Sequence, residues 1–182
     1  MNILVLVGST RRGSINARLA GAAVQELPAG TTVTGFDLTT LPFYDADRDA
    51  AGHSGATVTE FRAAVAAADG LLIASPAYNG GMAAEVKNAI DTASRPRGAA
   101  VIAGKPVGLL TAPLSPKTGP TVAEQLTLTL RIAGARPLPA VIAPGRESFD
   151  AQDRVVDALR VELDALATAL VEAIERSDTA AA

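Results

Sequence analysis

The sequence predicts an α/β fold in which a parallel sheet is covered by helices on both faces. Short aliphatic runs alternate with longer amphipathic segments along the 182 residues, which is typical of repeated strand-helix units. The aliphatic runs are nearly continuous, as expected of strands that are buried on both faces. Because 48% of the residues are hydrophobic, a chain of this length can bury one sizeable core, so we expect a single domain over residues 1–182.

The first half of the chain contributes three of the expected strands and two helices. The first aliphatic run ends at Gly8, and Pro28 and Gly30 end the first helix. The Asp-rich stretch 45–55 has no convincing period, so we expect a surface loop there. In order, the elements are a strand at 3–7, a helix at 15–27, a strand at 31–36, a helix at 57–68 and a strand at 70–75.

The second half continues the same alternation. Its elements are a helix at 83–93, a strand at 107–110, a helix at 122–133, a strand at 137–142 and a helix at 151–174. In the last helix one apolar stripe recurs at steps of three and four, formed by Val155, Leu159, Leu163, Leu166, Leu170 and Ile174. Residues 175–182 carry no apolar anchor, so we expect them to fray.

Five strands in a chain of this length suit the strand order 2-1-3-4-5 of a doubly wound sheet, in which strands one and three flank the switch point. Right-handed crossovers then place helices on both faces and give a three-layer sandwich. Ligands of such sheets bind outside the carboxyl ends of the strands at the switch point. The loops after Val7 and after Ser75 should therefore build the functional site.

Composition excludes several classes of function. The formal net charge of −3 and the pI of about 5.2 provide no general attraction for nucleic acid or for an anionic membrane surface. The chain has no cysteine, which excludes thiol redox chemistry and thiolate metal sites, and we predict no metal site. No apolar run approaches the roughly 20 residues that cross a bilayer, and the opening run lacks the features of a signal peptide. We therefore expect a cytoplasmic protein that binds neither nucleic acid nor membrane.

The first loop, residues 8–16, has the composition of a phosphate site. Hydroxyl, amide and guanidinium side chains gather where a helix begins, and the free N–H groups and the dipole of a helix N-terminus favour an anion. The spacing matches neither a Walker A motif nor the dinucleotide fingerprint, so a phosphate monoester is the better interpretation. In the alternative interpretation, Ser14 or Asn16 only caps the helix. That alternative leaves Arg11 and Arg12 beside the positive end of a helix, which is unfavourable without an anion.

The second loop, residues 75–81, is suited to a planar ring. Its Pro, Asn and two Gly expose backbone N–H and C=O groups that can read the polar edge of a flavin, and Tyr78 can stack on the ring. The alternative interpretation is a plain turn with Tyr78 on the surface. Together with the first loop, the second loop favours a ligand that carries both a phosphate and a flat heterocycle.

Both loops resemble the signatures of the NAD(P)H-dependent FMN reductase family. The first signature reads G-S-x-R-x-x-S-x-N and is matched at Gly8, Ser9, Arg11, Ser14 and Asn16. The second reads P-E-Y-N followed by K-N-A-I-D-W and S-R-P, and is matched at Pro76, Tyr78, Asn79, Lys87, Asn88, Ala89, Ile90, Asp91, Ser94, Arg95 and Pro96. The first match implies binding of the FMN phosphate, and the second implies contacts to the isoalloxazine ring.

The resemblance implies a flavodoxin-like fold and an oxidoreductase. Such an enzyme passes a hydride from NAD(P)H to FMN and then electrons to a small-molecule acceptor, such as a free flavin or a quinone. No side chain need act as an acid or a base, so we predict no catalytic residue, and we expect a homodimer or homotetramer. The residues predicted to bind FMN are Ser9, Arg11, Ser14, Ile15, Asn16, Pro76, Ala77, Tyr78, Asn79, Gly80 and Thr111.

The chain departs from the family pattern at the rim of this site. Ala77 replaces the usual glutamate, and Thr92 stands where tryptophan is frequent. Residues 111–120 replace a glycine-rich loop with a stiffer, cationic segment, in which Lys117 either approaches the flavin or the phosphate of the nicotinamide cofactor, or is solvated. These changes keep two alternatives open: a flavodoxin-type electron carrier that takes electrons from a partner protein, and a non-enzymatic phospholigand-binding protein on the same fold.

Overall fold

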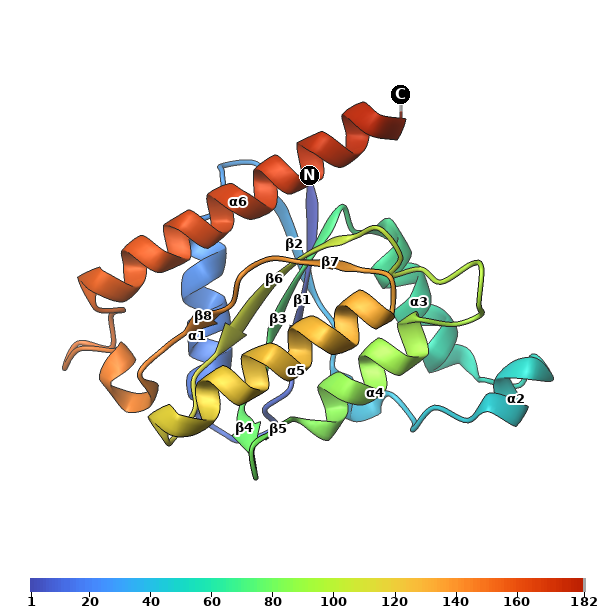
Figure 1. Cartoon of the computed structure of the whole chain (residues 1–182), viewed down its shortest axis with the longest axis horizontal. Coiled ribbons are helices and arrows are strands. Elements are labelled where there is room, and N and C mark those ends of the chain that lie inside the picture. The colour runs from blue at the N-terminus through green and yellow to red at the C-terminus, as the bar shows by residue number, and fades with distance from the viewer. Residues whose placement is uncertain (182) are drawn as a thin grey trace.

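A parallel sheet forms the middle layer of the computed structural model, which describes residues 1–181 (Figure 1). Its strands, in spatial order, are β2 (Thr32–Gly35), β1 (Asn2–Val7), β3 (Gly70–Ala74), β6 (Pro106–Thr111) and β7 (Arg136–Pro137), with β8 (Val141–Ile142) also paired to β6. Each neighbouring pair runs parallel. The predicted order 2-1-3-4-5 is therefore confirmed.

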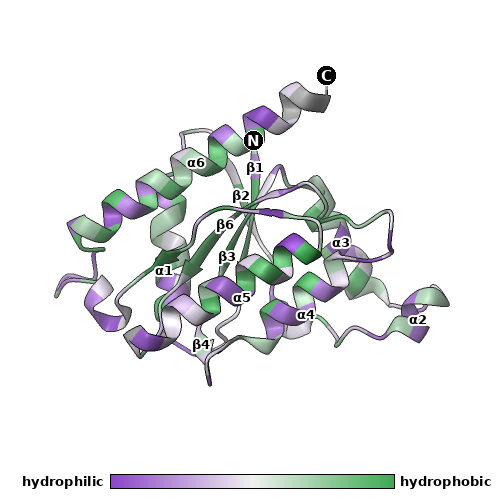
Figure 2. Cartoon of the chain, in the orientation of Figure 1, coloured by the Kyte–Doolittle hydropathy of each residue, from purple (hydrophilic) through white to green (hydrophobic). Residues whose placement is uncertain are grey.

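Helices cover both faces of the sheet, as the sequence predicted. One face carries α1 (Ile15–Gln25) and α6 (Asp157–Ala181), and the other carries α3 (Ala56–Ala67), α4 (Ala84–Ala93) and α5 (Gly119–Ile132). Alternate residues of a strand point to opposite faces, so Leu4 and Leu6 pack under one helix layer while Ile3 packs under the other. In Figure 2 the strands β3 and β6 are green along most of their length, whereas green and purple bands alternate along the helices. This pattern gives the three-layer sandwich.

The fifth strand differs from the prediction of one strand at 137–142. The structure divides this region into β7 and β8, which pair with the beginning and the end of β6. Pro137 and Pro139 have no N–H group, so a continuous ladder cannot form across them. Between them, the N–H of Leu138 still donates to the carbonyl of Val107 at 2.9 Å.

The last helix begins later and ends later than predicted. Residues 151–156 precede it, where the carboxylate of Asp150 accepts hydrogen bonds from the N–H groups of Gln152 and Arg154 and holds a turn. The helix then continues through Ala181, although we expected residues 175–182 to fray; Ala182 lies outside the described residues. Arg136 donates to the carbonyl of Ala173 and to the hydroxyl of Ser177, which anchors this end of α6 on β7.

Residues 45–55, expected to be a loop, contain the short helix α2 (Ala46–Ala50). The carboxylate of Asp45 accepts hydrogen bonds from the N–H groups of Asp47 and Arg48 and caps this helix. Arg62 of α3 donates to both carboxylate oxygens of Asp49, at 2.6 and 2.8 Å, and so fixes the segment on the protein.

The remaining regular segments are short. They are the 3₁₀ turns η1 (Leu38–Thr40), η2 (Pro116–Thr118) and η3 (Gly145–Ser148) and the hairpin strands β4 (Ala77–Tyr78) and β5 (Gly81–Met82). Among residues 1–181, no helix has both the length and the apolar character needed to cross a membrane.

Candidate functional site

Three loops meet at the carboxyl edge of the sheet, where such folds bind ligands. The first loop (residues 8–16) follows β1, the second loop (75–81) follows β3 and the third loop (111–120) begins at the end of β6. The N–H of Gly8 donates to the carbonyl of Ala74 at 2.9 Å, and the N–H of Ser75 donates to that of Leu110 at 3.0 Å. These two bonds bring the loops side by side at the predicted switch point.

The first loop presents free hydrogen-bond donors. Within the described part of the chain, no backbone N–H of residues 9–14 donates to another residue. Arg11 and Arg12 are exposed, and neither belongs to an ion pair among residues 1–181. These donors and charges lie beside the N-terminus of α1, whose dipole favours a negative group. The loop therefore has the chemistry of an anion site.

Two of the predicted residues of the first loop also have structural roles. The Oγ atom of buried Ser14 accepts a hydrogen bond from the N–H of Ala17 at 3.1 Å and caps α1, as the alternative interpretation required, but its hydroxyl hydrogen remains able to donate. Ile15 packs against the core beneath α1 and α6, so only its backbone N–H is available to a ligand.

Asn16 connects the first loop with the third. Its Nδ2 donates to the carbonyl of Ala112 at 3.2 Å, and its Oδ1 accepts from the N–H of the same residue at 2.9 Å. The side chain is buried, and both its donor and its acceptor are used in this pair. Asn16 therefore positions the two loops, a role that its place in the first signature did not reveal.

The second loop is a β-hairpin, which the sequence interpretation missed. β4 and β5 pair antiparallel, and Asn79 and Gly80, at the turn between them, have φ angles of 51° and 79°. Two positive φ values in a two-residue turn define type I′, for which Asn-Gly is the preferred sequence. Gln125 of α5 donates to the carbonyl of Gly80 at 3.2 Å, and Tyr78 is 50% exposed beside the turn. The hairpin thus presents a half-exposed aromatic side chain at the carboxyl edge of the sheet.

The base of the hairpin is packed closely. Buried Ser75 accepts a hydrogen bond from the N–H of Ala83 at 3.0 Å, and buried Pro76 and half-buried Ala77 lead into β4. A Cβ atom at Gly8 would lie 2.5 Å from Cγ2 of Val86, so the first loop approaches α4 at a distance that only glycine allows.

The third loop starts at Thr111, which is fully buried. Its Oγ1 has no hydrogen-bond partner in the described part of the chain. A buried hydroxyl without a partner is costly, and a polar ligand between the loops would supply one. Further along the loop, Lys117 is exposed on η2.

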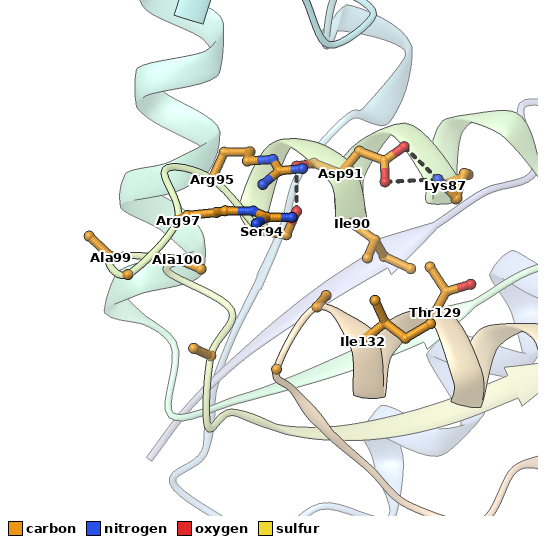
Figure 3. Close-up of a pocket in the computed structure, with 14 residues that line it drawn as sticks. Lys87, Ile90, Asp91, Ser94, Arg95, Arg97, Ala99, Ala100, Thr129 and Ile132 are labelled. Carbon is orange, nitrogen blue, oxygen red and sulfur yellow. Dashed lines mark hydrogen bonds and ion pairs between the residues drawn. The ribbon is translucent and has the colours of Figure 1, made fainter. Parts of the chain in front are cut away.

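The second signature is divided between two regions of the molecule. Asn88 donates to the carbonyl of Pro42 at 3.0 Å and accepts from the N–H of Tyr44 at 2.8 Å, so it holds residues 41–44 on α4. Ser94 and Arg95 follow at the far end of α4, where they line a cavity of about 670 Å³ between the ends of α4 and α5 (Figure 3). Within one chain, Asn88, Ser94 and Arg95 therefore do not make the contacts with a flavin ring that the resemblance implies.

The cavity does not have the character of a ligand site. Lys87 is paired with Asp91 at 2.7 Å, and the guanidinium groups of Arg95 and Arg97 lie close to the C-terminus of α4 (Figure 3). Cations at a helix C-terminus are favourable in themselves. The charges of this cavity are thus explained without a ligand, in contrast to those of the first loop.

The donor set of the three loops fits FMN. The free N–H groups and arginines suit a phosphate, Tyr78 suits a planar ring, and the unpartnered Thr111 hydroxyl suits a polar edge. Among residues 1–181, no cluster of three or more His, Asp or Glu side chains could hold a metal ion. A doubly wound sheet with such a site at its switch point defines a flavodoxin-like protein that binds FMN.

The chain belongs to the NADPH-dependent FMN reductase family, whose model matches residues 1–148. It is 36% identical over 160 residues to an NAD(P)H-dependent FMN reductase of Pseudomonas aeruginosa, covering 86% of this chain and 85% of that one. It is 41% identical over 110 residues to a 2-hydroxy-1,4-benzoquinone reductase of Burkholderia sp., covering 60% of this chain and 59% of that one. Among solved structures, the flavoenzyme NAD(P)H:(acceptor) oxidoreductase FerB of Paracoccus denitrificans is similar, with a TM-score of 0.76 and 25% identity. The similarity covers 96% of this chain and 97% of that one.

The protein is therefore an oxidoreductase that uses NAD(P)H and FMN, as the resemblance predicted. When bound, FMN supplies the redox chemistry, accepting a hydride from NAD(P)H and passing electrons to an acceptor. Membership of this family favours the reductase over both the flavodoxin-type carrier and the non-enzymatic phospholigand-binding protein.

Proposed function

We propose that residues 1–182 act as one FMN-binding domain whose first loop holds the phosphate and whose hairpin carries the ring. The free backbone N–H groups of residues 9–14, together with Arg11, carry this proposal. Ser9 and Ser14 add hydroxyl donors to the phosphate. The remaining contacts come from the residues that the sequence predicted: Ile15 through its N–H, Asn16 through the loop that it positions, and Pro76, Ala77, Tyr78, Asn79, Gly80 and Thr111 around the ring.

The chain's part in the reaction is binding and orientation. The three loops contain no Asp, Glu or His that could act as an acid or base beside the ring. The hairpin would orient the ring of FMN, and half-exposed Tyr78 would leave room for a second flat molecule beside it. No side chain need transfer a proton.

We further propose that the electron acceptor is a small quinone or a free flavin. The Burkholderia relative is named for reduction of a hydroxylated benzoquinone, and other similar proteins from plants and bacteria are named as quinone reductases. A quinone is flat and uncharged, and it suits a site whose open side is formed by an aromatic side chain and a hairpin.

The phosphate site can be tested by comparing the affinities of FMN and riboflavin, which differ only in the phosphate. We expect wild-type protein to bind FMN far more tightly, because riboflavin cannot use the donors of the first loop. Arg11→Gln should weaken FMN binding about tenfold and leave riboflavin binding unchanged. Arg48→Gln, which removes an exposed arginine from α2, serves as the matched control. Equal affinities for the two ligands in wild-type protein would contradict a phosphate site.

We also propose a homodimer or homotetramer formed through α5. Leu128 and Ile132, one helical turn apart on α5, are 61% and 79% exposed, and large apolar side chains are seldom so exposed in a cluster without a partner. Light scattering of the wild-type protein should give the molar mass of at least two chains. The double variant Leu128→Glu/Ile132→Glu should have a lower molar mass. Val161→Glu on α6, at a side chain 69% exposed, should leave it unchanged. A monomeric wild-type protein would rule out the assembly.

We propose the cytoplasm as the location, because reduced nicotinamide cofactors are produced and maintained there. Cell fractionation should recover the protein with cytoplasmic enzymes. Recovery in another fraction would contradict this assignment.

A further inference from the structure

Phe43 is a large apolar side chain that the protein holds out in solvent. It is 81% exposed, and no large apolar side chain among residues 1–181 is more exposed. Its backbone is fixed on both sides, because the buried amide of Asn88 on α4 donates to the carbonyl of Pro42 at 3.0 Å and accepts from the N–H of Tyr44 at 2.8 Å. An exposed aromatic side chain on a fixed segment has the character of an interface anchor.

The cavity between the ends of α4 and α5 is a recess that can hold such a side chain. Ile90 of α4 and Ile132 of α5 face it, and Ala99, Ala100 and Ala103 also line it (Figure 3). Its volume is about 670 Å³. A cavity of about 150 Å³ is large enough for benzene, so this one has room for a phenylalanine ring and part of the segment that carries it. Ile132, 79% exposed at this cavity, shows that a single chain leaves its apolar surface uncovered.

The exposed ridge of α4 lies between Phe43 and the cavity. Lys87 and Asp91, one turn apart on this ridge, line the cavity. Asn88, which holds Phe43 through its neighbours, follows Lys87 by one residue and therefore lies about 100° further round the helix. The two features thus flank α4. A two-fold axis that runs along this ridge places the Phe43 of each chain over the cavity of the other.

The charges beside these two features are complementary. Just after the exposed aromatic side chain, the carboxylates of Asp45 and Asp47 are exposed and outnumber the exposed guanidinium of Arg48. At the cavity, Arg95 and Arg97 belong to no ion pair among residues 1–181. A second copy that inserts its aromatic side chain brings its acidic segment to these two guanidinium groups. Contact between two identical acidic segments would be repulsive instead.

We propose that Phe43 of each chain inserts into the cavity between α4 and α5 of a second copy, so that one dimer makes this contact twice. The inference rests on the homodimer proposed above and adds the occupant of the cavity. Leu128 and Ile132 of α5 lie in the same interface, because Ile132 lines the cavity.

Cross-linking tests this contact directly, because the chain contains no cysteine. Phe43→Cys and Ala100→Cys are placed in separate chains with different affinity tags, which are co-expressed, loaded with FMN and purified through both tags. A short bis-maleimide reagent should then join the two chains into a covalent dimer on a denaturing gel. Phe43→Cys paired with Val161→Cys on α6 is the matched control and should give no covalent dimer.

Each other result counts against the insertion. Phe43→Cys chains that cross-link to one another, and not to Ala100→Cys, overturn it, because each Phe43 then meets its own copy. Tagged chains that copurify without cross-linking overturn it and leave the homodimer standing. Chains that do not copurify overturn the homodimer and this inference together. Visible absorbance of the same samples reports bound FMN, so the proposed FMN site is judged separately.

The dissociation constant of the dimer gives an independent measurement. Phe43→Ser should raise it about a hundredfold or more, because two aromatic rings no longer leave water when the dimer forms. Val161→Ser, which shortens an apolar side chain of similar exposure on α6, should leave it unchanged. A dissociation constant that Phe43→Ser does not change would contradict the insertion.

Discussion

The side chain of Asn16 binds both backbone groups of Ala112, at 3.2 Å and 2.9 Å, across 96 residues of sequence. This pair connects the loop after β1 with the loop after β6. Because both residues are buried, water cannot take the place of the hydrogen-bond partner that is lost when either residue is changed.

Asn16→Ala should therefore destabilise the protein and weaken FMN binding together. Loss of the amide leaves the buried N–H and carbonyl of Ala112 unpaired, and we expect a decrease of about 2–3 kcal/mol in the free energy of unfolding. Urea denaturation and FMN titration measure the two effects. Gln25→Ala, at an exposed amide on the same helix, is the control and should change neither. An Asn16→Ala protein with wild-type stability would show that the pair does not hold the loops.

Gly80→Ala should disturb the hairpin and lower the affinity for FMN. The φ angle of Gly80 is 79°, and a left-handed conformation costs an alanine about 1–2 kcal/mol. Gly81→Ala is a close control, because Gly81 has no positive φ and its added Cβ would lie at an ordinary 3.5 Å from the carbonyl oxygen of Tyr78. If both variants bind FMN equally, the turn geometry does not position the ring.

Arg18→Gln should loosen the segment that precedes α6. The Arg18 guanidinium lies 3.8 Å from the centre of the Phe149 ring and forms an ion pair with Asp153. A cation over an aromatic face contributes about 0.5–1 kcal/mol at a partly exposed site. Hydrogen exchange should become faster in residues 148–155 but not in the central strands. Arg160→Gln, which removes an exposed pair with Asp157, should leave these exchange rates unchanged.

Stability should fall in acid partly through Asp49. Hydrogen bonds from Arg62 and Ser54 lower the pKa of this carboxyl group from 3.8 to about 2. Because the folded pKa is depressed, the stabilisation is present above 3.8 and is lost as the pH falls from 3.8 towards about 2. The difference in unfolding free energy between wild-type protein and Asp49→Asn should therefore shrink over this interval. A difference that stays constant with pH would mean that the Asp49 carboxylate does not contribute.

The fold could be predicted because its determinants are local. Continuous aliphatic runs mark strands buried on both faces, and the breakers at Pro28 and Gly30 mark the end of a helix. The predicted bounds of the fifth strand and the last helix were wrong because they depend on single residues and on contacts between segments far apart in the sequence. Pro137 and Pro139 divide the fifth strand, and Arg136, which lies beside them, anchors the end of α6.

The loops of the candidate site could be predicted from the sequence, but the contacts that hold them together could not. The composition of residues 8–16 predicts an anion site there, and this stays a prediction. The partners of Asn16 and Asn88 lie 96 and 44 to 47 residues away, so no local pattern could reveal that these amides hold loops together. The Asn79-Gly80 hairpin, by contrast, was signalled by its sequence and was overlooked.

FMN held by this chain and reduced by NAD(P)H would be visible in its absorbance. We would record the visible spectrum of FMN-supplemented, desalted protein without oxygen, before and after addition of NADPH and then NADH. We expect the flavin bands to survive desalting and to bleach within seconds of adding a nicotinamide cofactor. Flavin bands that stay oxidised would contradict the reductase and favour an electron carrier, and a protein that neither retains FMN nor reduces it in solution would contradict the whole assignment.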